Sequence, residues 1–235
     1  MELTIDENFA KRVPGYRAVI IEADVANRPT SEAQIAEMKR LADSIADTFT
    51  IEMINRRPTI AATRRAYKAC GKDPNRYRPS QEQLMRRIVR GLGLYTVNAL
   101  VDAGNMLSLI TGCSVGCFDA DKVVGKTLRL GIGEHGEPYE GIGRGPLNIE
   151  GLPVFRDDVG GIGTPTSDNE RTKIEVSTTR LLMTIHLFDP ATDADETIAT
   201  ARRIFTDYGS ATSFSACIHS PGSVSDYRAD SNACV

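Results

Sequence analysis

The stretch of sequence that decides the fold opens with Tyr67-Lys68-Ala69-Cys70-Gly71-Lys72-Asp73-Pro74-Asn75-Arg76-Tyr77-Arg78-Pro79-Ser80. It continues through Val101-Asp102-Ala103-Gly104-Asn105 and closes with Gly116-Cys117-Phe118-Asp119. The sequence before it has the pattern of a strand and a helix, and the sequence after it has mainly the pattern of strands. The stretch itself holds the clearest helix signals and most of the clustered basic charge.

A helix followed by a loop is predicted around the first of these segments. Pro58 can occupy the first turn of a helix over residues 59–69, because its missing N–H and fixed φ suit that place, and Gly71 can end the helix. Residues 73–79 have a proline near each end, which excludes a long regular element and predicts a loop.

Two further helices are predicted by their caps. Ser80 and Gln83 have the spacing of a capping box, and the helix that they begin should stop at Gly91. Asn98 is expected to cap a helix that runs to residue 111.

The flanking sequence predicts a mixed architecture with a β-rich second half. A β-branched run over residues 17–25 predicts a buried strand, and Ser31 caps a helix over residues 32–48. Apolar spacing predicts another helix over residues 193–207. The remaining strands are expected at residues 127–130, 152–155, 181–187 and 213–219, with glycine-rich turns at 131–136, 141–145 and 160–163. We therefore expect an α+β fold with mixed sheets and helices.

Length and composition are those of an ordinary globular protein. The chain has 235 residues, of which 41% are hydrophobic and 25% are charged, so it can bury a core without disulfides or metals. No apolar run approaches the roughly 18 residues of a membrane span, and the first residues lack a signal-peptide pattern. We expect a cytoplasmic protein with no membrane partner, a single domain over residues 1–220 with a strand-helix extension (1–60), and a mobile tail (221–235).

Basic charge is concentrated in one part of an acidic chain. Residues 56–90 contain eleven basic side chains and only two acidic ones, Asp73 and Glu82, although the whole chain has a net charge of −3. Such a cluster can bind a polyanion such as RNA by counterion release, or it can be a solvated face paired with acidic groups elsewhere. The RNA-binding candidates are Arg64, Arg65, Lys68, Lys72, Arg76, Arg78, Arg86 and Arg87.

The sequence gives no strong signal for a metal site, a cofactor site or a catalytic histidine. The five cysteines are scattered and form no Cys-x-x-Cys pair, so we expect free, mostly buried thiols and no metal site. The run Gly131-Ile132-Gly133-Glu134-His135-Gly136 fits a dinucleotide fingerprint by letters, but Glu137-Pro138 follows it where a helix should begin. We interpret it as a hairpin loop and expect no cofactor. His186, in an apolar strand, is expected to be structural.

Two groups of polar residues are candidates for a site. Asp102 and Asn105 lie three residues apart beside Gly104, so they can present polar groups together on one face of their helix or simply face solvent. The polar stretch over residues 167–172 follows a glycine turn, where it can line a site or form a solvated connection.

The ordered series of motifs over residues 67–190 resembles the B3/B4 domain of the bacterial phenylalanyl-tRNA synthetase β subunit, and still more the free-standing B3/B4 proteins. In the synthetase this domain hydrolyses tyrosine that is wrongly attached to the phenylalanine tRNA. The resemblance implies the B3/B4 fold and a tRNA-editing pocket.

The family's site residues transfer unevenly to this chain. The family's Asn corresponds to Asn105, whereas its Thr and His positions correspond to Gly104 and Gly116. Its Glu falls near Glu170 by a loose alignment that selects Arg171 equally well. The resemblance therefore implies Asn105 and Glu170 as catalytic residues and a substrate pocket formed by Asp102, Gly104, Gly116 and Phe118. The two glycines are expected to enlarge this pocket and to change its specificity.

Two functions follow as hypotheses. The first is an aminoacyl-tRNA deacylase that acts in trans on mischarged tRNA. The second is a module without chemistry that binds RNA, an amino acid or a protein. The sequence has no motif of a synthetase catalytic subunit, so we expect the chain not to be a complete aminoacyl-tRNA synthetase.

Overall fold

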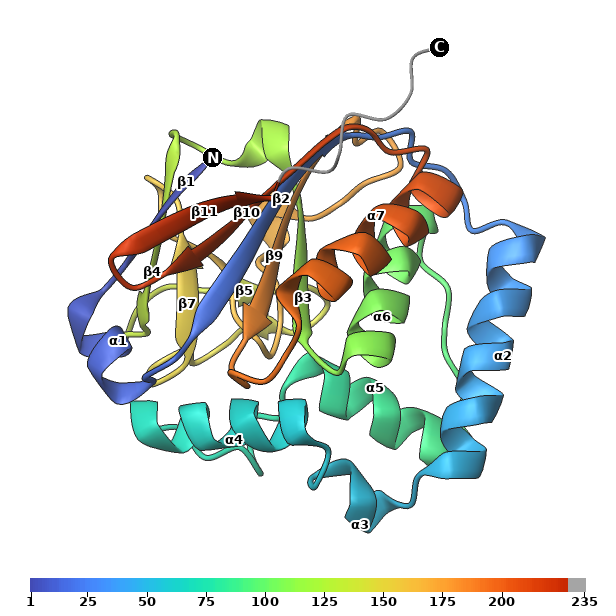
Figure 1. The fold of residues 1–235 in the computed structure, drawn as a ribbon, viewed down its shortest axis with the longest axis horizontal. Helices are drawn as coiled ribbons and strands as arrows, with labels where there is room; N and C mark the ends of the chain where they lie inside the picture. The colour runs from blue at the N-terminus through green and yellow to red at the C-terminus, as the bar shows by residue number, and fades with distance from the viewer. Residues whose placement is uncertain (228–235) are drawn as a thin grey trace.

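The computed structural model describes residues 1–227, and Figure 1 shows their arrangement. The elements follow one another as β1 (Glu2–Ile5), α1 (Glu7–Arg12), β2 (Arg17–Asp24), α2 (Glu32–Thr48), α3 (Ile51–Ile54), α4 (Pro58–Cys70), α5 (Ser80–Val89), α6 (Ala99–Thr111), β3 (Ser114–Asp119), the 3₁₀ turn η1 (Ala120–Lys122), β4 (Thr127–Ile132), β5 (Glu140–Gly141), β6 (Gly145–Pro146), β7 (Pro153–Arg156), β8 (Gly161–Gly163), the 3₁₀ turn η2 (Glu170–Thr172), β9 (Arg180–Leu187), α7 (Ala194–Gly209), β10 (Thr212–Ser220) and β11 (Ser223–Tyr227). This is the expected α+β fold with mixed sheets.

The larger sheet has the strand order β11-β10-β2-β9-β3, and every neighbouring pair is antiparallel. The N-terminal strand β2 lies at its centre, where Val19 pairs with Ile185 of β9 and Ile218 of β10. Residues 1–60, expected as an extension, thus supply the central strand. Strand β3 forms one edge of this sheet and pairs only with β9 among the described residues.

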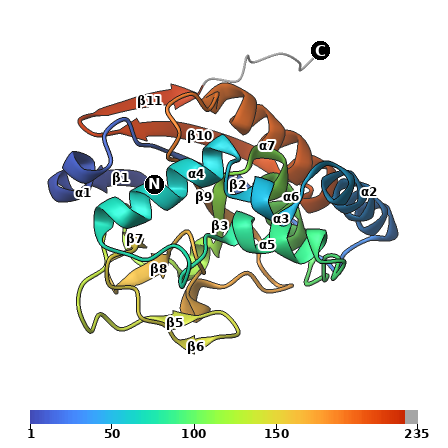
Figure 2. The same cartoon turned by 90° about the horizontal axis from the view of Figure 1, so that it is seen from below.

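The smaller sheet has the order β1-β4-β7-β8, with β1 parallel to β4 and the other pairs antiparallel. A short hairpin of β5 and β6 forms a third sheet. Figure 2 shows this hairpin at the lower edge of the molecule, opposite β10 and β11.

The core lies on both faces of the larger sheet. Because side chains alternate along a strand, Val19 and Ile21 of β2 pack with residues of α6 and α7. Ala18 and Ile20 face the other way, toward the smaller sheet and α1. The nearly continuous apolar run of β2 is therefore explained by burial on both faces.

The helices α2, α3, α4 and α5 meet around a separate apolar cluster. Helix α5 also contacts α6 and β3, so it lies against the edge of the larger sheet. Figure 1 shows α5 between α4 and α6. No helix in the described part of the chain has both the length and the apolar character needed to cross a membrane.

Most predicted elements are confirmed. Helix α2 has the predicted bounds and its Ser31 cap, and Asn98 caps α6 through its side chain, which accepts from the Val101 N–H. Gly71 ends α4 in the left-handed conformation. The predicted strand at residues 17–25 is β2.

Three local expectations need correction. The capping box at Ser80 is wrong: Pro79 holds the N-cap position, and the Ser80 N–H donates to the Pro165 carbonyl over 2.7 Å. A tertiary contact therefore replaces the local cap. The turn expected at 160–163 contains strand β8. Within the segment expected as a tail, residues 223–227 pair with β10 as strand β11, and residues 228–235 lie outside the described part.

Candidate functional site

A polar loop over residues 164–168 joins β8 to the chain before η2. The Thr164 hydroxyl organises it: this oxygen accepts from the N–H groups of Thr166 and Ser167 and donates to the Ser167 carbonyl. Two buried tyrosines hold it from outside, because the hydroxyl of Tyr67 bonds to that of Thr166 over 2.9 Å and Tyr139 donates to the Ser167 carbonyl over 2.7 Å. The loop is thus fixed by hydrogen bonds at nearly every residue.

This loop places Asp168 at the edge of the larger sheet. The Asp168 carboxylate accepts a hydrogen bond of 3.2 Å from the Cys117 N–H of β3. Burial raises the pKa of Asp168 to about 7, and the hydrogen bond from Cys117 opposes part of that rise. A carboxyl group that titrates near neutral pH, in a hollow, is typical of functional sites.

The hollow beside Asp168 has a volume of about 220 Å³. It lies between α5, α6, β3, the β5–β6 hairpin and the 164–168 loop, and its wall includes Asn105, Val115, Ile142, Arg144, Thr166 and Asp168. Asn105 is only partly buried, and its side-chain amide has no hydrogen-bond partner among the described residues. The structure thus brings Asn105 together with Asp168, an acidic residue of the polar stretch over residues 167–172.

Glu170 lies outside this hollow. It belongs to η2, and its carboxylate pairs with Lys173. Asp168 and Glu170 are separated by Asn169, whose backbone forms a bridge with Gly141. Within the polar stretch over residues 167–172, the acidic residue that reaches the hollow is Asp168.

Asp102 is also absent from the wall of the hollow. It neither presents a polar group beside Asn105 nor faces solvent. Its side chain is fully buried and accepts hydrogen bonds from the Thr30 hydroxyl (2.5 Å) and the Val97 N–H (3.1 and 3.2 Å). Burial raises the pKa of Asp102, and these hydrogen bonds oppose the rise. The residue anchors the segment between α5 and α6.

The two glycines do not enlarge the pocket, because neighbouring side chains already fill the space. A Cβ built on Gly104 would lie 2.9 Å from the Cys117 sulfur. At Gly116, a Cβ would lie 2.7 Å from the Phe118 ring and 3.1 Å from a carboxylate oxygen of Asp168. Phe118 itself is fully buried in the core between the two sheets. The Asp168 carboxylate therefore adjoins the position at which the resemblance places a His.

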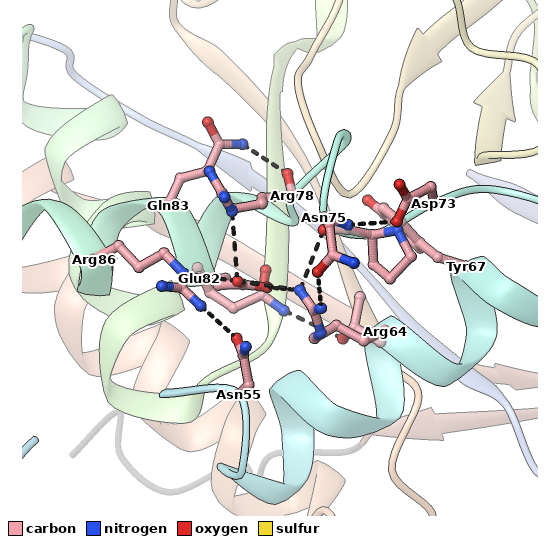
Figure 3. A network of polar contacts seen from close by, with 12 residues as sticks. Asn55, Arg64, Tyr67, Asp73, Asn75, Arg78, Glu82, Gln83 and Arg86 are labelled. Carbon is pink, nitrogen blue, oxygen red and sulfur yellow. Dashed lines mark hydrogen bonds and ion pairs between the residues drawn. The ribbon is translucent and has the colours of Figure 1, made fainter. Parts of the chain in front are cut away.

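The basic segment divides into buried and exposed members. Figure 3 shows Arg64 and Arg86 converging on Glu82, which is fully buried. Their guanidinium groups lie 2.9 and 2.8 Å from the Glu82 carboxylate, and Arg86 also donates to the Asn55 side chain. Lys72 is buried as well and donates to the carbonyls of Asn148 and Glu150. Burial lowers the pKa of Lys72.

These three residues thus hold the fold rather than face solvent. Four other candidates have exposed side chains, and Arg87 is partly exposed. The exposed four are Arg65, Lys68, Arg76 and Arg78.

Comparisons with known proteins agree with this fold. The model of a family described as the B3/4 domain matches residues 62–206. The phenylalanine–tRNA ligase beta subunit of Bartonella henselae is 32% identical over 110 residues, which cover 46% of this chain and 13% of that protein. This chain therefore spans only a small part of that relative.

A solved structure is similar over nearly the whole chain. It is the crystal structure of an N-terminal fragment of the phenylalanyl-tRNA synthetase beta-subunit from Pyrococcus horikoshii. The TM-score is 0.51 at 12% sequence identity, and the alignment covers 97% of this chain and 54% of the fragment. At this identity the likeness concerns the fold.

Proposed function

Because the chain belongs to the B3/4 domain family, we propose that it hydrolyses the ester bond of mischarged aminoacyl-tRNA, acting in trans. The observation that carries this proposal is that Asp168 and Asn105 line one hollow. The first offers a carboxyl group that is half ionised near neutral pH, and the second offers an amide without a partner among the described residues.

The reaction assigns one task to each group. The Asp168 carboxylate takes a proton from a water molecule while the water oxygen forms a bond to the ester carbonyl carbon. The Asn105 amide donates to the oxygen of that carbonyl, where negative charge develops. The bond between the carbonyl carbon and the ribose oxygen then breaks, and Asp168 returns the proton to that ribose oxygen. The products are the free amino acid and the uncharged tRNA.

The position of Asp168 supports this assignment. It adjoins Gly116, at which the resemblance implies a His, so a proton acceptor is present although that His is absent. General bases work best when their pKa lies near the working pH, and the pKa of Asp168, at about 7, meets that condition. The exposed cations Arg65, Lys68 and Arg76 supply positive charge for the tRNA backbone.

A panel of mischarged tRNAs tests the proposal. The wild-type protein should release the amino acid from at least one of them faster than the spontaneous rate. Asp168→Asn and Asn105→Ala should lower turnover more than they weaken tRNA binding. Glu170→Gln is the matched control, because this acidic residue is two positions away and pairs with Lys173 outside the hollow.

An absence of hydrolysis would also be informative. If no tRNA of the panel is hydrolysed above the spontaneous rate, the deacylase proposal is wrong. Binding of RNA, an amino acid or a protein without turnover would then favour the module without chemistry.

A further inference from the structure

A second hollow adjoins the first and is strongly cationic. It has a volume of about 320 Å³ and lies between α5 and the segment that leads to α6. Four arginines line it together with Leu92 and Tyr95, and no acidic side chain of the described residues does. The arginines are Arg78, Arg86, Arg87 and Arg90. We call it the arginine hollow.

Two of these arginines have no acidic partner within ion-pair distance among the described residues. Arg86 is paired with the buried Glu82, and Arg78 lies 3.8 Å from the same carboxylate. Arg87 donates only to the Leu92 carbonyl, over 3.3 Å, and Arg90 is exposed at the end of α5. Their positive charge is therefore available to an anion.

Tyr95 adds an aromatic surface to this charge. Tyr95 is 53% exposed although it is large and partly apolar, and the Arg87 guanidinium lies 5.3 Å from the ring centre. An aromatic ring beside unpaired arginines is the combination by which proteins hold single-stranded nucleic acid, because bases stack on the ring and phosphates pair with the cations.

The two hollows share a wall. Gln83, Leu84 and Tyr95 line both of them. A polymer that lies across Tyr95 therefore places one monomer unit in the arginine hollow and the next unit beside Asn105 and Asp168. The volume lies at the lower end of the roughly 300–1,000 Å³ of small-molecule sites, which suits one nucleotide.

We propose that the arginine hollow binds a phosphodiester and a stacked base of single-stranded RNA, namely the nucleotide that precedes the acylated 3′-terminal ribose. The inference rests on the proposed function, because the strand direction follows from placing the ester in the adjoining hollow. Arg87 and Arg90 bind the phosphate, and Tyr95 stacks on the base.

A binding experiment without any acylated substrate tests this site. The probe is a fluorescently labelled oligoribonucleotide that ends in single-stranded CCA with a free 3′ hydroxyl, and the comparison is a blunt-ended RNA hairpin. The wild-type protein should bind the single strand more tightly. Arg87→Ala with Arg90→Ala should weaken binding at least tenfold and flatten the dependence of log Kd on log salt by about 0.7, since each phosphate neutralised on a single strand contributes about 0.7.

Matched variants separate stacking and general charge from this site. Tyr95→Ala should weaken binding about fivefold to a hundredfold, while Tyr95→Phe should bind like the wild type. Arg65→Ala with Lys68→Ala removes the same charge from α4 and should have a smaller effect on the single strand. Thermal unfolding shows whether each variant folds. The inference is wrong if the Arg87, Arg90 and Tyr95 variants fold and bind like the wild type, or if the hairpin binds equally well.

Kinetics distinguish this inference from the proposed function. If the wild type hydrolyses aminoacyl-tRNA, the arginine-hollow variants should raise KM and leave kcat nearly unchanged, whereas Asp168→Asn should lower kcat. Unchanged KM in folded variants would overturn the arginine hollow while the deacylase stands. Tight, Tyr95-dependent binding of the single strand without hydrolysis would support the arginine hollow while the deacylase fails.

Discussion

The Cys117 N–H donates a hydrogen bond to the Asp168 carboxylate across the edge of the larger sheet, over 3.2 Å. This bond joins residues that are 51 positions apart. It occupies an N–H of the edge strand β3, and it favours the ionised form of a carboxyl group whose protonated form is favoured by burial.

Activity should depend on the ionisation of Asp168. As a general base it works only when ionised, so kcat/KM should increase with pH up to about 7 and level off above it. Asp168→Asn should lower kcat by about 10²- to 10⁴-fold and remove this pH dependence. Steady-state hydrolysis of a mischarged tRNA between pH 5.5 and 8.5 measures both. A wild-type rate that is flat across this range would contradict the assignment.

The ionisation of Asp168 should lower the stability of the fold, although it raises activity. Because the Asp168 pKa is higher in the folded protein than in the unfolded chain, the folded state holds this proton more tightly. Its contribution to stability is therefore full below about pH 4 and is lost as the pH rises to about 7. At pH 8, Asp168→Asn should be more stable than the wild type by about 1–3 kcal/mol.

Urea unfolding at pH 5 and pH 8 measures that difference. The variant must be compared with the wild type at each pH, because burial lowers the pKa of His186 to about 3 and makes the protein less stable as the pH falls below about 6.5. An equal difference between variant and wild type at both pH values would show that Asp168 does not titrate in this range.

Glu82 should be essential to the stability of the packed helices α4 and α5. Glu82→Gln leaves Arg64 and Arg86 without their buried anionic partner, so it should destabilise the protein by about 3–5 kcal/mol. Glu7→Gln breaks a solvent-exposed pair with Lys11 and should change stability little. Denaturant midpoints of the two variants give the comparison, and a small loss for Glu82→Gln would contradict the structural role.

Gly116 should not tolerate a side chain. Its Cβ would meet the Phe118 ring at 2.7 Å and the Thr184 hydroxyl at 2.9 Å, and both of these residues are buried. Gly116→Ala should therefore cost about 1–3 kcal/mol by overpacking. Gly131→Ala is the control, since its Cβ would meet the Arg156 guanidinium no closer than 3.2 Å and the Asp6 Cβ at an ordinary contact distance of 3.6 Å. Equal stability of the two variants would show that the space at Gly116 is open.

Asp102→Ala should loosen the segment before α6. The change leaves the Val97 N–H and the Thr30 hydroxyl without their acceptor, which costs about 1–3 kcal/mol. Hydrogen exchange should become faster at Val97 and its neighbours, and KM should rise because Tyr95 lies in the same segment. Unchanged exchange at Val97 would contradict the anchoring role.

The parts of the fold that local chemistry determines were predictable. Ser31 and Asn98 cap their helices with their own side chains, and Gly71 supplies the positive φ that ends α4. Ser80 has the same capping pattern in the sequence, but its N–H donates a hydrogen bond to the Pro165 carbonyl. A partner 85 positions away leaves no trace in the spacing of residues around Ser80.

The site was less predictable for the same reason. Asp168 and Glu170 lie in one polar stretch and differ by two positions, and the turn organised by Thr164 decides which of them reaches the hollow. Likewise, Arg64 and Arg65 are neighbours on α4, but about 100° of helix rotation turns one toward Glu82 and the other to solvent. Asn105 was expected from the resemblance and lines the hollow, whereas the stretch 167–172 was expected only as a whole and Asp168 is its acidic residue on the wall.

The central place of β2 has a consequence for how the chain is made. Its partners β9 and β10 lie about 160 and 195 residues later in the sequence, so a ribosome must synthesise the chain to about residue 220 before the larger sheet can close. Until then β2 has two unpaired edges and a run of exposed isoleucine and valine, the features by which nascent chains associate wrongly or recruit chaperones. Refolding from denaturant should be slow for the same reason, because such distant pairings have a high contact order.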